Sequence, residues 1–247
     1  MKISIITATR NSENTISDAI NSLANQSYVD VEHIIIDGAS RDSTVNIILN
    51  KKNDNTKIYS EKDNGIYDAL NKGIDAASGD IIGFLHSDDV LQDESSISNV
   101  VNAFSSGEYN AVYGNLDYVF QHNLSKVARR WVSGEFTLEK LKNGWMPPHP
   151  AFYMTKDLYE RLGKYDQNYQ ISADYDGMLR YLLSGELKLK YLPMVLTKMR
   201  LGGVSNKSIK NIMLKTKEDF SIMEKHGLPA IRCILGKNFS KLRQFIV

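Results

Sequence analysis

Residues 80–90, DIIGFLHSDDV, contain the pattern from which the fold can be predicted. An apolar run at 80–85 has the composition of a buried strand, and two adjacent aspartates, Asp88 and Asp89, follow it. Neighbouring carboxylates repel each other unless both face water or a cation lies between them. The pair therefore predicts a bound cation at the end of a strand. The alternative is a solvated turn, or a cap for the helix expected from about 93–96.

Segments with the patterns of strands and helices alternate over the first 120 residues. The expected strands are 3–8, 31–38, 56–61 and 80–85, and the expected helices are 16–23, 40–51 and 65–77. Such alternation predicts an α/β fold with a parallel sheet. Because the strands are almost continuously apolar, we expect helices on both faces of the sheet.

The pattern loosens in the second half of the chain. It predicts, in order, a hairpin (110–120 with 126–132), a short helix (136–144), a proline-rich loop entering a strand (145–154), a helix (174–185), a strand (187–196), a turn (202–206) and an amphipathic helix (208–226). The complete sheet is therefore expected to be mixed but mostly parallel.

Length and composition exclude several classes of protein. The 247 residues suit one sizeable domain, or one domain with a small appendage, and no apolar run is long enough to span a bilayer. The N-terminus begins as a strand and lacks the features of a signal peptide. Cys233 is the single cysteine, which excludes a disulfide framework and a cysteine-based zinc site and favours a cytoplasmic setting.

Charge is distributed unevenly along the chain. Residues 1–186 carry 17 Lys and Arg against 26 Asp and Glu, whereas residues 187–247 carry 13 against three. The last segment, 230–247, has no acid and repeats apolar residues at helical spacing, with Gly236 as a weak point of the helix. This pattern predicts a helix lying on an anionic membrane. The alternatives are a helix packed on the body of the protein or a homodimer contact.

Acidic residues follow the predicted strands. The carboxyl ends of parallel strands lie at one edge of a sheet, where ligands of open α/β folds bind. That edge is expected to collect Thr7, Asp37, Glu61, Asp88 and Asp89. Carboxylate oxygens suit Mg²⁺ and Mn²⁺, which often bridge to substrate phosphates.

Several ordered motifs carry a resemblance to a known family. They are SIITATRN, DGASRDST, EKDNGIYDALNKGIDAASGD, FLHSDDV, HPAFYM, SADYDGMLR and GGVSN, and they extend over about residues 2–205. The chain resembles the family-2 glycosyltransferases, which are inverting nucleotide-sugar enzymes with the GT-A fold. The resemblance implies a GT-A catalytic domain at 1–206, with a donor half at 1–118 and an acceptor half at 119–206. A basic helical extension, 207–247, follows.

The resemblance also implies roles for individual residues of the donor half. Thr7 and Asp37 would hold the nucleotide base, Thr9 would also bind the donor, and Asp63 and Asp68 would line the donor pocket. Asp88 would lie near the ribose or sugar, and Asp89, with Asp88 beside it, would bind Mn²⁺ or Mg²⁺. His86 stands where the family often has an aspartate.

Four residues of the acceptor half are implied in the same way. Asp174 matches the catalytic base, although Ala173 replaces the usual preceding glutamate. A base at this position would deprotonate the attacking hydroxyl of the acceptor; the alternative is a helix cap. His149 would lie at the acceptor site, or be an ordinary hydrogen-bonded loop residue. Lys198 and Arg200 would reach the diphosphate, or be surface charges beside a turn.

Other nucleotide-binding classes lack support in the sequence. The first strand is not followed by G-x-G-x-x-G, and no G-x-x-x-x-G-K-[ST] is present, which argues against a dehydrogenase and a P-loop enzyme. The first loop lacks the glycine-rich, basic pattern of a sugar nucleotidyltransferase, and ARRW at 128–131 lacks the Gln of processive synthases. The remaining alternative is a non-catalytic nucleotide-sugar-binding module. Retention of Asp37, Asp88, Asp89 and Asp174 together argues against it.

The sequence therefore predicts a metal-dependent, inverting glycosyltransferase that moves one sugar from a UDP-linked donor. The resemblance implies a lipid-linked acceptor of O-antigen, capsule or exopolysaccharide biosynthesis. It also implies a location on the cytoplasmic face of the plasma membrane. We expect no nucleic-acid partner.

Overall fold

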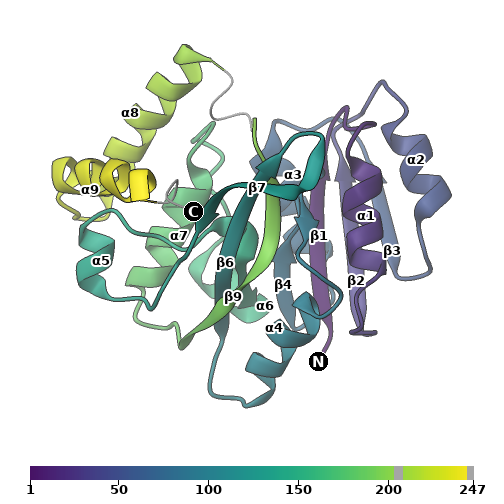
Figure 1. Ribbon diagram of the computed structural model, residues 1–247, viewed down its shortest axis with the longest axis horizontal. Coiled ribbons are helices and arrows are strands. Elements are labelled where there is room, and N and C mark those ends of the chain that lie inside the picture. The colour runs from purple at the N-terminus through teal and green to yellow at the C-terminus, as the bar shows by residue number, and fades with distance from the viewer. Residues whose placement is uncertain (203–207, 244–247) are drawn as a thin grey trace.

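The computed structural model describes residues 1–202 and 208–243, apart from the side chains of Ile209 and 238–243. Most of the predicted turn at 202–206 and the last four residues of the predicted membrane helix lie outside this range. Figure 1 shows one curved sheet with helices packed around it. Its strand order is β3-β2-β1-β4-β8-β6-β9-β5, and β7 pairs with β6.

The first four strands form the predicted parallel unit. They are β1 (Ile3–Thr9), β2 (Val31–Asp37), β3 (Thr56–Ser60) and β4 (Ile81–Phe84). Alternate residues of each strand point to opposite faces. Ile6 packs toward α3 (Ile66–Ala76), whereas Ile5 packs toward α1 (Ile16–Ala24) and α4 (Ser96–Ser105). Both faces are therefore covered, as the apolar strands predicted.

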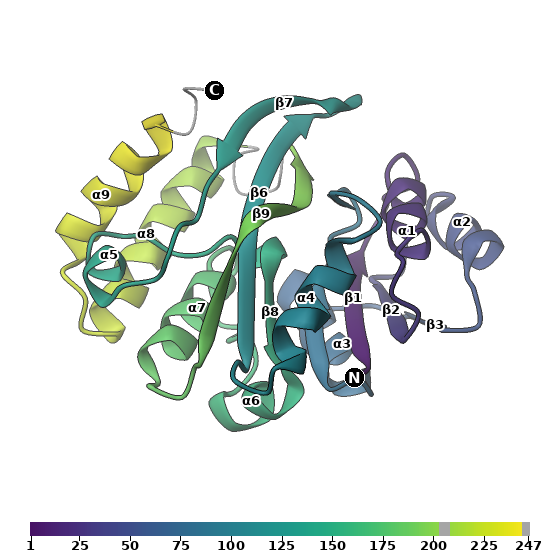
Figure 2. The same cartoon turned by 60° about the horizontal axis from the view of Figure 1, so that its bottom comes forward.

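The antiparallel pairs all involve strands that follow residue 89. They join β4 to β8 (Phe152–Thr155), β8 to β6 (Ala111–Phe120), β6 to β7 (Asn123–Trp131), and β5 (Val90–Leu91) to β9 (Leu189–Arg200). The long strands β6 and β9 are parallel to each other. Figure 2 shows the hairpin of β6 and β7 extending beyond the body of the molecule. The predicted mixed sheet is confirmed.

The remaining helices are α2 (Thr44–Lys51), α5 (Leu138–Lys142), the 3₁₀ turn η1 (His149–Ala151), α6 (Lys156–Leu162), α7 (Ala173–Leu183), α8 (Ile209–Lys225) and α9 (Ala230–Arg243). α2 begins four residues later than predicted. Asp42 Oδ1 accepts a hydrogen bond from Thr44 N, so the preceding residues form a loop. Neither β5 nor α6 was predicted, because both are short.

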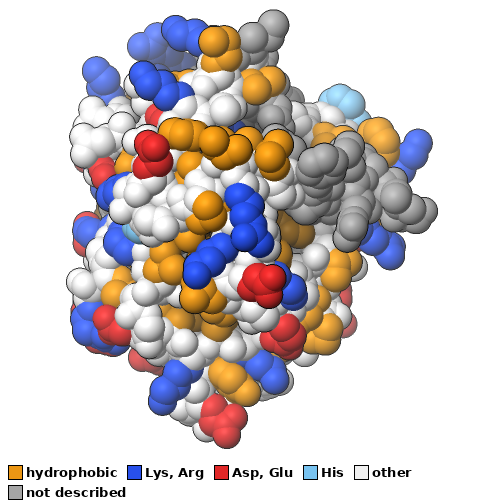
Figure 3. All heavy atoms as spheres, turned by 90° about the vertical axis from the view of Figure 1, so that its left-hand side faces the viewer, with side chains coloured by type: hydrophobic (Ala, Val, Ile, Leu, Met, Phe, Trp, Pro, Cys, Tyr) orange, Lys and Arg blue, Asp and Glu red, His pale blue; other side chains and the backbone are white. Residues whose placement is uncertain are grey.

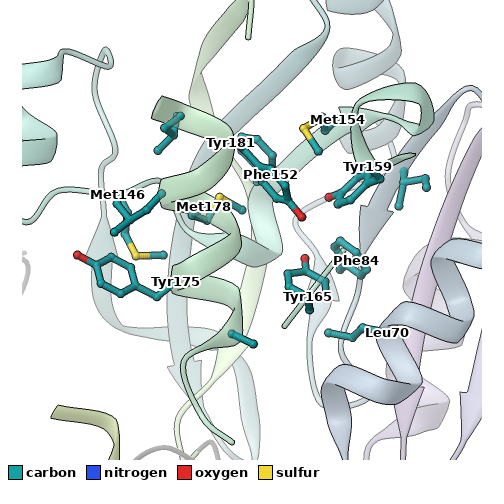
Figure 4. Packing of buried hydrophobic residues seen from close by; sticks show 14 of the residues in the cluster. Leu70, Phe84, Met146, Phe152, Met154, Tyr159, Tyr165, Tyr175, Met178 and Tyr181 are labelled. Atoms are coloured by element: carbon teal, nitrogen blue, oxygen red, sulfur yellow. The ribbon is translucent and has the colours of Figure 1, made fainter. Parts of the chain in front are cut away.

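The C-terminal helices share the largest apolar core with the sheet. Ile222, Met223 and Cys233 are fully buried in the cluster that contains Tyr175 and Met178 of α7. Figure 4 shows the part of this cluster around α7. The division at residue 206 stays a prediction, but the second half of α8 and the start of α9 are packed on the body.

Gly236 allows α9 to approach the end of α5 closely. A Cβ atom at Gly236 would lie 2.0 Å from the carbonyl oxygen of Asn143, and one at Gly144 would lie 2.1 Å from the carbonyl oxygen of Cys233. The backbone of α9 thus contacts the backbone just after α5 at two glycines, Gly236 and Gly144, which have no side chain to separate them. The glycine that weakens the helix in the sequence is required by this contact.

Candidate active site

The candidate site lies at the carboxyl ends of β1 and β4, where the strand order changes direction. The chain runs from β1 outward to β2 and β3, then returns to place β4 on the other side of β1. Such a reversal opens a crevice that binds ligands in open α/β sheets. The loops that follow β1, β2 and β4 leave the sheet at this same edge (Figure 1).

Thr7 is a buried residue of β1, and its side chain contacts β2 and the segment after β4. Its side chain is fully buried, and its hydroxyl donates a hydrogen bond to Leu85 O at 2.7 Å. The same hydroxyl lies 3.0 Å from Nε2 of His33, whose pKa burial lowers to about 4. A neutral His33 can donate to Thr7. The structure therefore places Thr7 among supporting contacts, and its predicted contact with the base stays a prediction.

Asp37 is also fully buried, at the end of β2. Its Oδ2 accepts hydrogen bonds from Ser40 N at 3.1 Å and Ser60 Oγ at 2.7 Å, and its Oδ1 accepts one from Ser40 Oγ. These bonds fold the loop after β2 over the carboxylate. Ala39 in this loop has a φ of 53°, a conformation that costs energy for a residue with a side chain. The loop is thus held in a specific shape beside the crevice.

Thr9 and Asp63 lie beside the same loop, and Asp68 lies at the start of α3. A Cβ atom at Gly38 would lie 2.3 Å from Oδ2 of Asp63, so a larger residue at Gly38 would displace this carboxylate. Asp68 accepts a hydrogen bond from Asn64 N at 3.0 Å and orders the turn before α3. Thr9 Oγ1 is buried without a partner among the described residues. Since buried hydroxyls are normally satisfied, Thr9 is suited to a contact with a ligand.

Arg200 holds the segment of the two adjacent aspartates through hydrogen bonds. Its side chain is 4% exposed, and it donates from Nη1 to Asp88 O at 2.6 Å and from Nη2 to Asp18 Oδ2 at 2.5 Å. Arg200 N donates to Asp89 Oδ1 at 3.2 Å. The guanidinium therefore supports the loop that carries the two aspartates. The contact of Arg200 with the diphosphate stays a prediction. Almost none of its side chain is exposed to receive a phosphate.

Asp89 is a buried carboxylate with an incomplete set of partners. Its Oδ2 has no hydrogen-bond partner within the described residues, and its side chain is fully buried. Burial, and secondarily the charge of Asp88, raise its pKa well above the usual range. A buried charge is stable only when it is paired or bound to a metal. The open oxygen and the second carboxylate beside it fit a divalent cation.

Asp174, at the start of α7, comes from the other half of the chain and contacts α3. Its Oδ1 accepts a hydrogen bond from the hydroxyl of Tyr67 on α3, at 3.1 Å. Burial lowers the pKa of His86, while the charges of Asp88 and Asp174 act in the opposite direction. The role of Asp174 as the base stays a prediction.

His149 lies deeper, in an aromatic cluster below the site. Its ring centroid is 5.6 Å from that of His86 and 5.0 Å from that of Phe84. Its Nδ1 lies 3.3 Å from the hydroxyl of Tyr165, while its Nε2 has no partner in the described part of the chain. Burial, together with the nearby His86, lowers the pKa of His149 to about 3, so it is neutral. A contact with an acceptor stays a prediction.

Lys198 occupies a half-buried position on β9, in register with Asp117 and with Val90, the residue after Asp89. Burial raises the pKa of Asp117, and Lys198 acts in the opposite direction. The contact of Lys198 with the diphosphate stays a prediction.

Tyr67 was not predicted as a site residue. The signal that was available is its position inside the quoted motif NGIYDALNKG, one turn before Asn71.

Comparison with known sequences identifies the family. The sequence profile described as "Glycosyl transferase family 2" matches residues 4–163, more than half of the chain. This protein belongs to glycosyl transferase family 2. A "PGL/p-HBAD biosynthesis glycosyltransferase" of Mycobacterium tuberculosis is 29% identical over 217 residues, covering 86% of this chain and 82% of the relative. An uncharacterized glycosyltransferase of the same species is 33% identical over 184 residues, covering 73% and 69%.

Solved structures share the fold of this family 2 member. S. aureus TarS 1–349 in complex with UDP-GlcNAc superposes with a TM-score of 0.72 at 17% identity, covering 92% of this chain and 65% of that one. A mannosyltransferase of Pyrobaculum calidifontis in complex with GDP-Man and Mn²⁺ superposes with a TM-score of 0.68 at 16% identity, covering 96% and 68%. These matches confirm the predicted GT-A fold.

Proposed function

We propose that this glycosyltransferase moves a single sugar from a UDP-linked donor, with inversion, to a lipid-linked acceptor of bacterial surface-glycan biosynthesis. The observation that carries the proposal is the hydrogen bond that joins Asp174, from the predicted acceptor half, to Tyr67 of α3 in the donor half of a family 2 chain. The donor class and the acceptor are inferred by analogy with the complex of TarS with UDP-GlcNAc and with the PGL/p-HBAD relative.

In the proposed reaction, Asp174 is the general base. It accepts the proton of the acceptor hydroxyl while that oxygen forms a bond to the anomeric carbon of the sugar. The bond from the anomeric carbon to the diphosphate oxygen breaks on the opposite face, and the nucleoside diphosphate leaves with the bonding electrons. Tyr67 orients the carboxylate through its hydrogen bond to Oδ1.

Asp89 and Asp88 would hold the divalent cation. No three His, Cys, Asp or Glu side chains converge as a metal cage in the described chain. This fits Mg²⁺ or Mn²⁺, which keep waters and use substrate phosphates as further ligands. When bound, the cation would balance the negative charge that develops on the leaving diphosphate.

Donor binding should be visible as thermal stabilisation. We expect one class among UDP-glucose, UDP-GlcNAc, GDP-mannose, a dTDP-sugar and a CMP-sugar to raise the melting temperature by about 5–10 °C with Mn²⁺. That range corresponds to a stabilisation of about 2.7 kcal/mol, which a ligand provides when its concentration is 100 times its dissociation constant. EDTA should abolish the shift. A well-folded protein that responds to none of these donors would contradict the proposal.

The membrane part of the proposal rests on α9. Ile231 and Leu235 are 71% and 54% exposed and line an apolar groove of about 610 Å³ together with Arg232. Figure 3 shows basic and hydrophobic side chains close together on this side of the molecule. No helix among the described residues has the length and apolarity needed to cross a bilayer. Contact with an anionic lipid surface would instead bury the two side chains and place Arg232 near the headgroups.

Negative charges placed on the exposed apolar residues of α9 should release the protein from anionic membranes. We expect the double variant Ile231→Glu/Leu235→Glu to bind phosphatidylglycerol-containing vesicles at least tenfold more weakly, since burying one such side chain contributes about 1.5–3 kcal/mol. Vesicle cosedimentation measures this. Val29→Glu, at an exposed apolar residue before β2, is the matched control and should bind normally. Equal binding by the double variant and the control would refute a role of α9.

A further inference from the structure

Helix α8 anchors the segment that immediately precedes the helix of the proposed base. Oε1 of Glu218 accepts a hydrogen bond from Gln170 N at 2.8 Å. Its Oε2 accepts two more, from Ile171 N at 3.0 Å and Ser172 N at 2.9 Å. One carboxylate thus satisfies three consecutive backbone donors, and the next residue begins α7.

The cap residue of α7 is itself held from α8. A helix start leaves its first backbone N–H groups without partners inside the helix, and a Ser at the cap position usually accepts one of them. Ser172 is the cap residue of α7, but its hydroxyl donates to Asp219 Oδ1 of α8 at 2.8 Å. Lys215 and Lys237 in turn donate to Asp219 Oδ2, at 2.7 and 2.8 Å. The start of α7 is therefore fixed from α8.

The same segment is held from the opposite side by α3. The hydroxyl of Tyr67 contacts Ile171 O at 2.6 Å and Asp174 Oδ1 at 3.1 Å. Residues 170–172 thus lie between Glu218 and Tyr67, and Asp174 is the second residue of α7. Any shift of this segment moves the carboxylate of Asp174 with it. A misplacement of about 1 Å in a catalytic group can reduce a rate about 10²-fold.

We propose that Glu218 is a positioning residue for Asp174: it fixes the backbone from which the base projects, and it acts only through that residue. The proposal rests on the proposed function of Asp174. It assigns the C-terminal helix α8, which lies beyond the region matched by the family profile, a part in the transfer step.

The test is Glu218→Gln in the full-length protein. The amide keeps one acceptor oxygen but turns an N–H₂ donor toward backbone N–H groups, so at least one of the three bonds is lost. We expect kcat to fall at least tenfold while KM for the donor, and the thermal shift it produces, stay within about twofold. Amide hydrogen exchange at 170–172 should accelerate. The assay follows release of the nucleoside diphosphate, using the donor selected above, Mn²⁺ and octyl glycosides as acceptors.

Two further variants separate positioning from general damage. Glu224→Gln makes the same change at an exposed residue of the same helix and should behave as the wild type. Glu218→Asp keeps the charge and both acceptor oxygens, so we expect it to recover part of the rate. This variant also tests the proposal if the glutamine variant does not fold. A Glu218→Asp protein as slow as one without the carboxylate would overturn it.

A double variant shows whether Glu218 acts through the base. Asp174→Asn/Glu218→Gln should be no slower than Asp174→Asn alone, because the base that Glu218 positions is already absent. Additive losses would overturn the proposal. If Asp174→Asn is slow but Glu218→Gln matches the wild type, only the role of Glu218 fails. If the wild type binds a donor and transfers no sugar, the proposed function fails and this inference with it.

Discussion

The Asp174→Asn variant is expected to lose about 10²–10⁴-fold in transfer rate, the usual contribution of a positioned general base. The amide has nearly the shape of the carboxylate, and its oxygen can still accept the hydrogen bond from Tyr67. Folding and donor binding should therefore be preserved. What is lost is the ability to take the proton from the acceptor hydroxyl, so the loss should fall on kcat.

Two measurements check this interpretation. The melting temperature and the donor-induced shift should equal those of Asp54→Asn, which makes the same chemical change at an exposed residue before β3. Steady-state kinetics should show a low kcat at nearly constant KM for the donor. An Asp174→Asn protein that is folded but no longer binds the donor would count against the role of base and favour a donor contact.

The Asp89→Asn variant is expected to lose the metal-dependent part of donor stabilisation completely. The carboxylate supplies a negative charge and the unpartnered Oδ2, whereas an amide is a poor ligand for Mn²⁺. The donor-induced shift should therefore fall from about 5–10 °C to the value that the wild type shows in EDTA. Glu94→Gln, at an exposed carboxylate a few residues further along, should leave the shift unchanged.

Without metal, the same variant should melt no lower than the wild type at neutral pH. The pKa of Asp89 is raised in the folded protein, so the folded state holds its proton more tightly than the unfolded state does. Stability then falls as the pH rises above the ordinary pKa of about 3.9. A neutral asparagine avoids this loss. A large fall in melting temperature without metal would mean that the carboxylate is already balanced inside the protein.

The parallel half of the fold could be predicted because its signals are local. Strands of this half are marked by apolar runs, and their ends are marked by polar residues at one edge of the sheet. The direction in which a side chain points was harder to predict. Thr7 belongs to a strand buried on both faces, and Arg200 is the buried last residue of a largely half-buried strand, so periodicity does not show whether either side chain faces the site or the body.

The contacts made by α8 could not be predicted for a different reason. Glu218 is 46 to 48 residues from its three backbone partners, and nothing in a single sequence records that pairing. As a sequence pattern, Glu218 and Asp219 are two acids in a basic, amphipathic helix, which is the usual appearance of a solvated face. Only the packed position of the helix shows that both carboxylates point toward the start of α7.

The late position of α8 in the chain bears on how the enzyme is made. During synthesis, β1 to β4 and the donor loops emerge first, and at about 5–20 residues per second Glu218, which lies 44 residues after Asp174, follows it by about 2–9 s. Until then the segment before Asp174 lacks its anchor on α8. The geometry around Asp174 is therefore completed only when α8 packs against the start of α7, late in the formation of the fold.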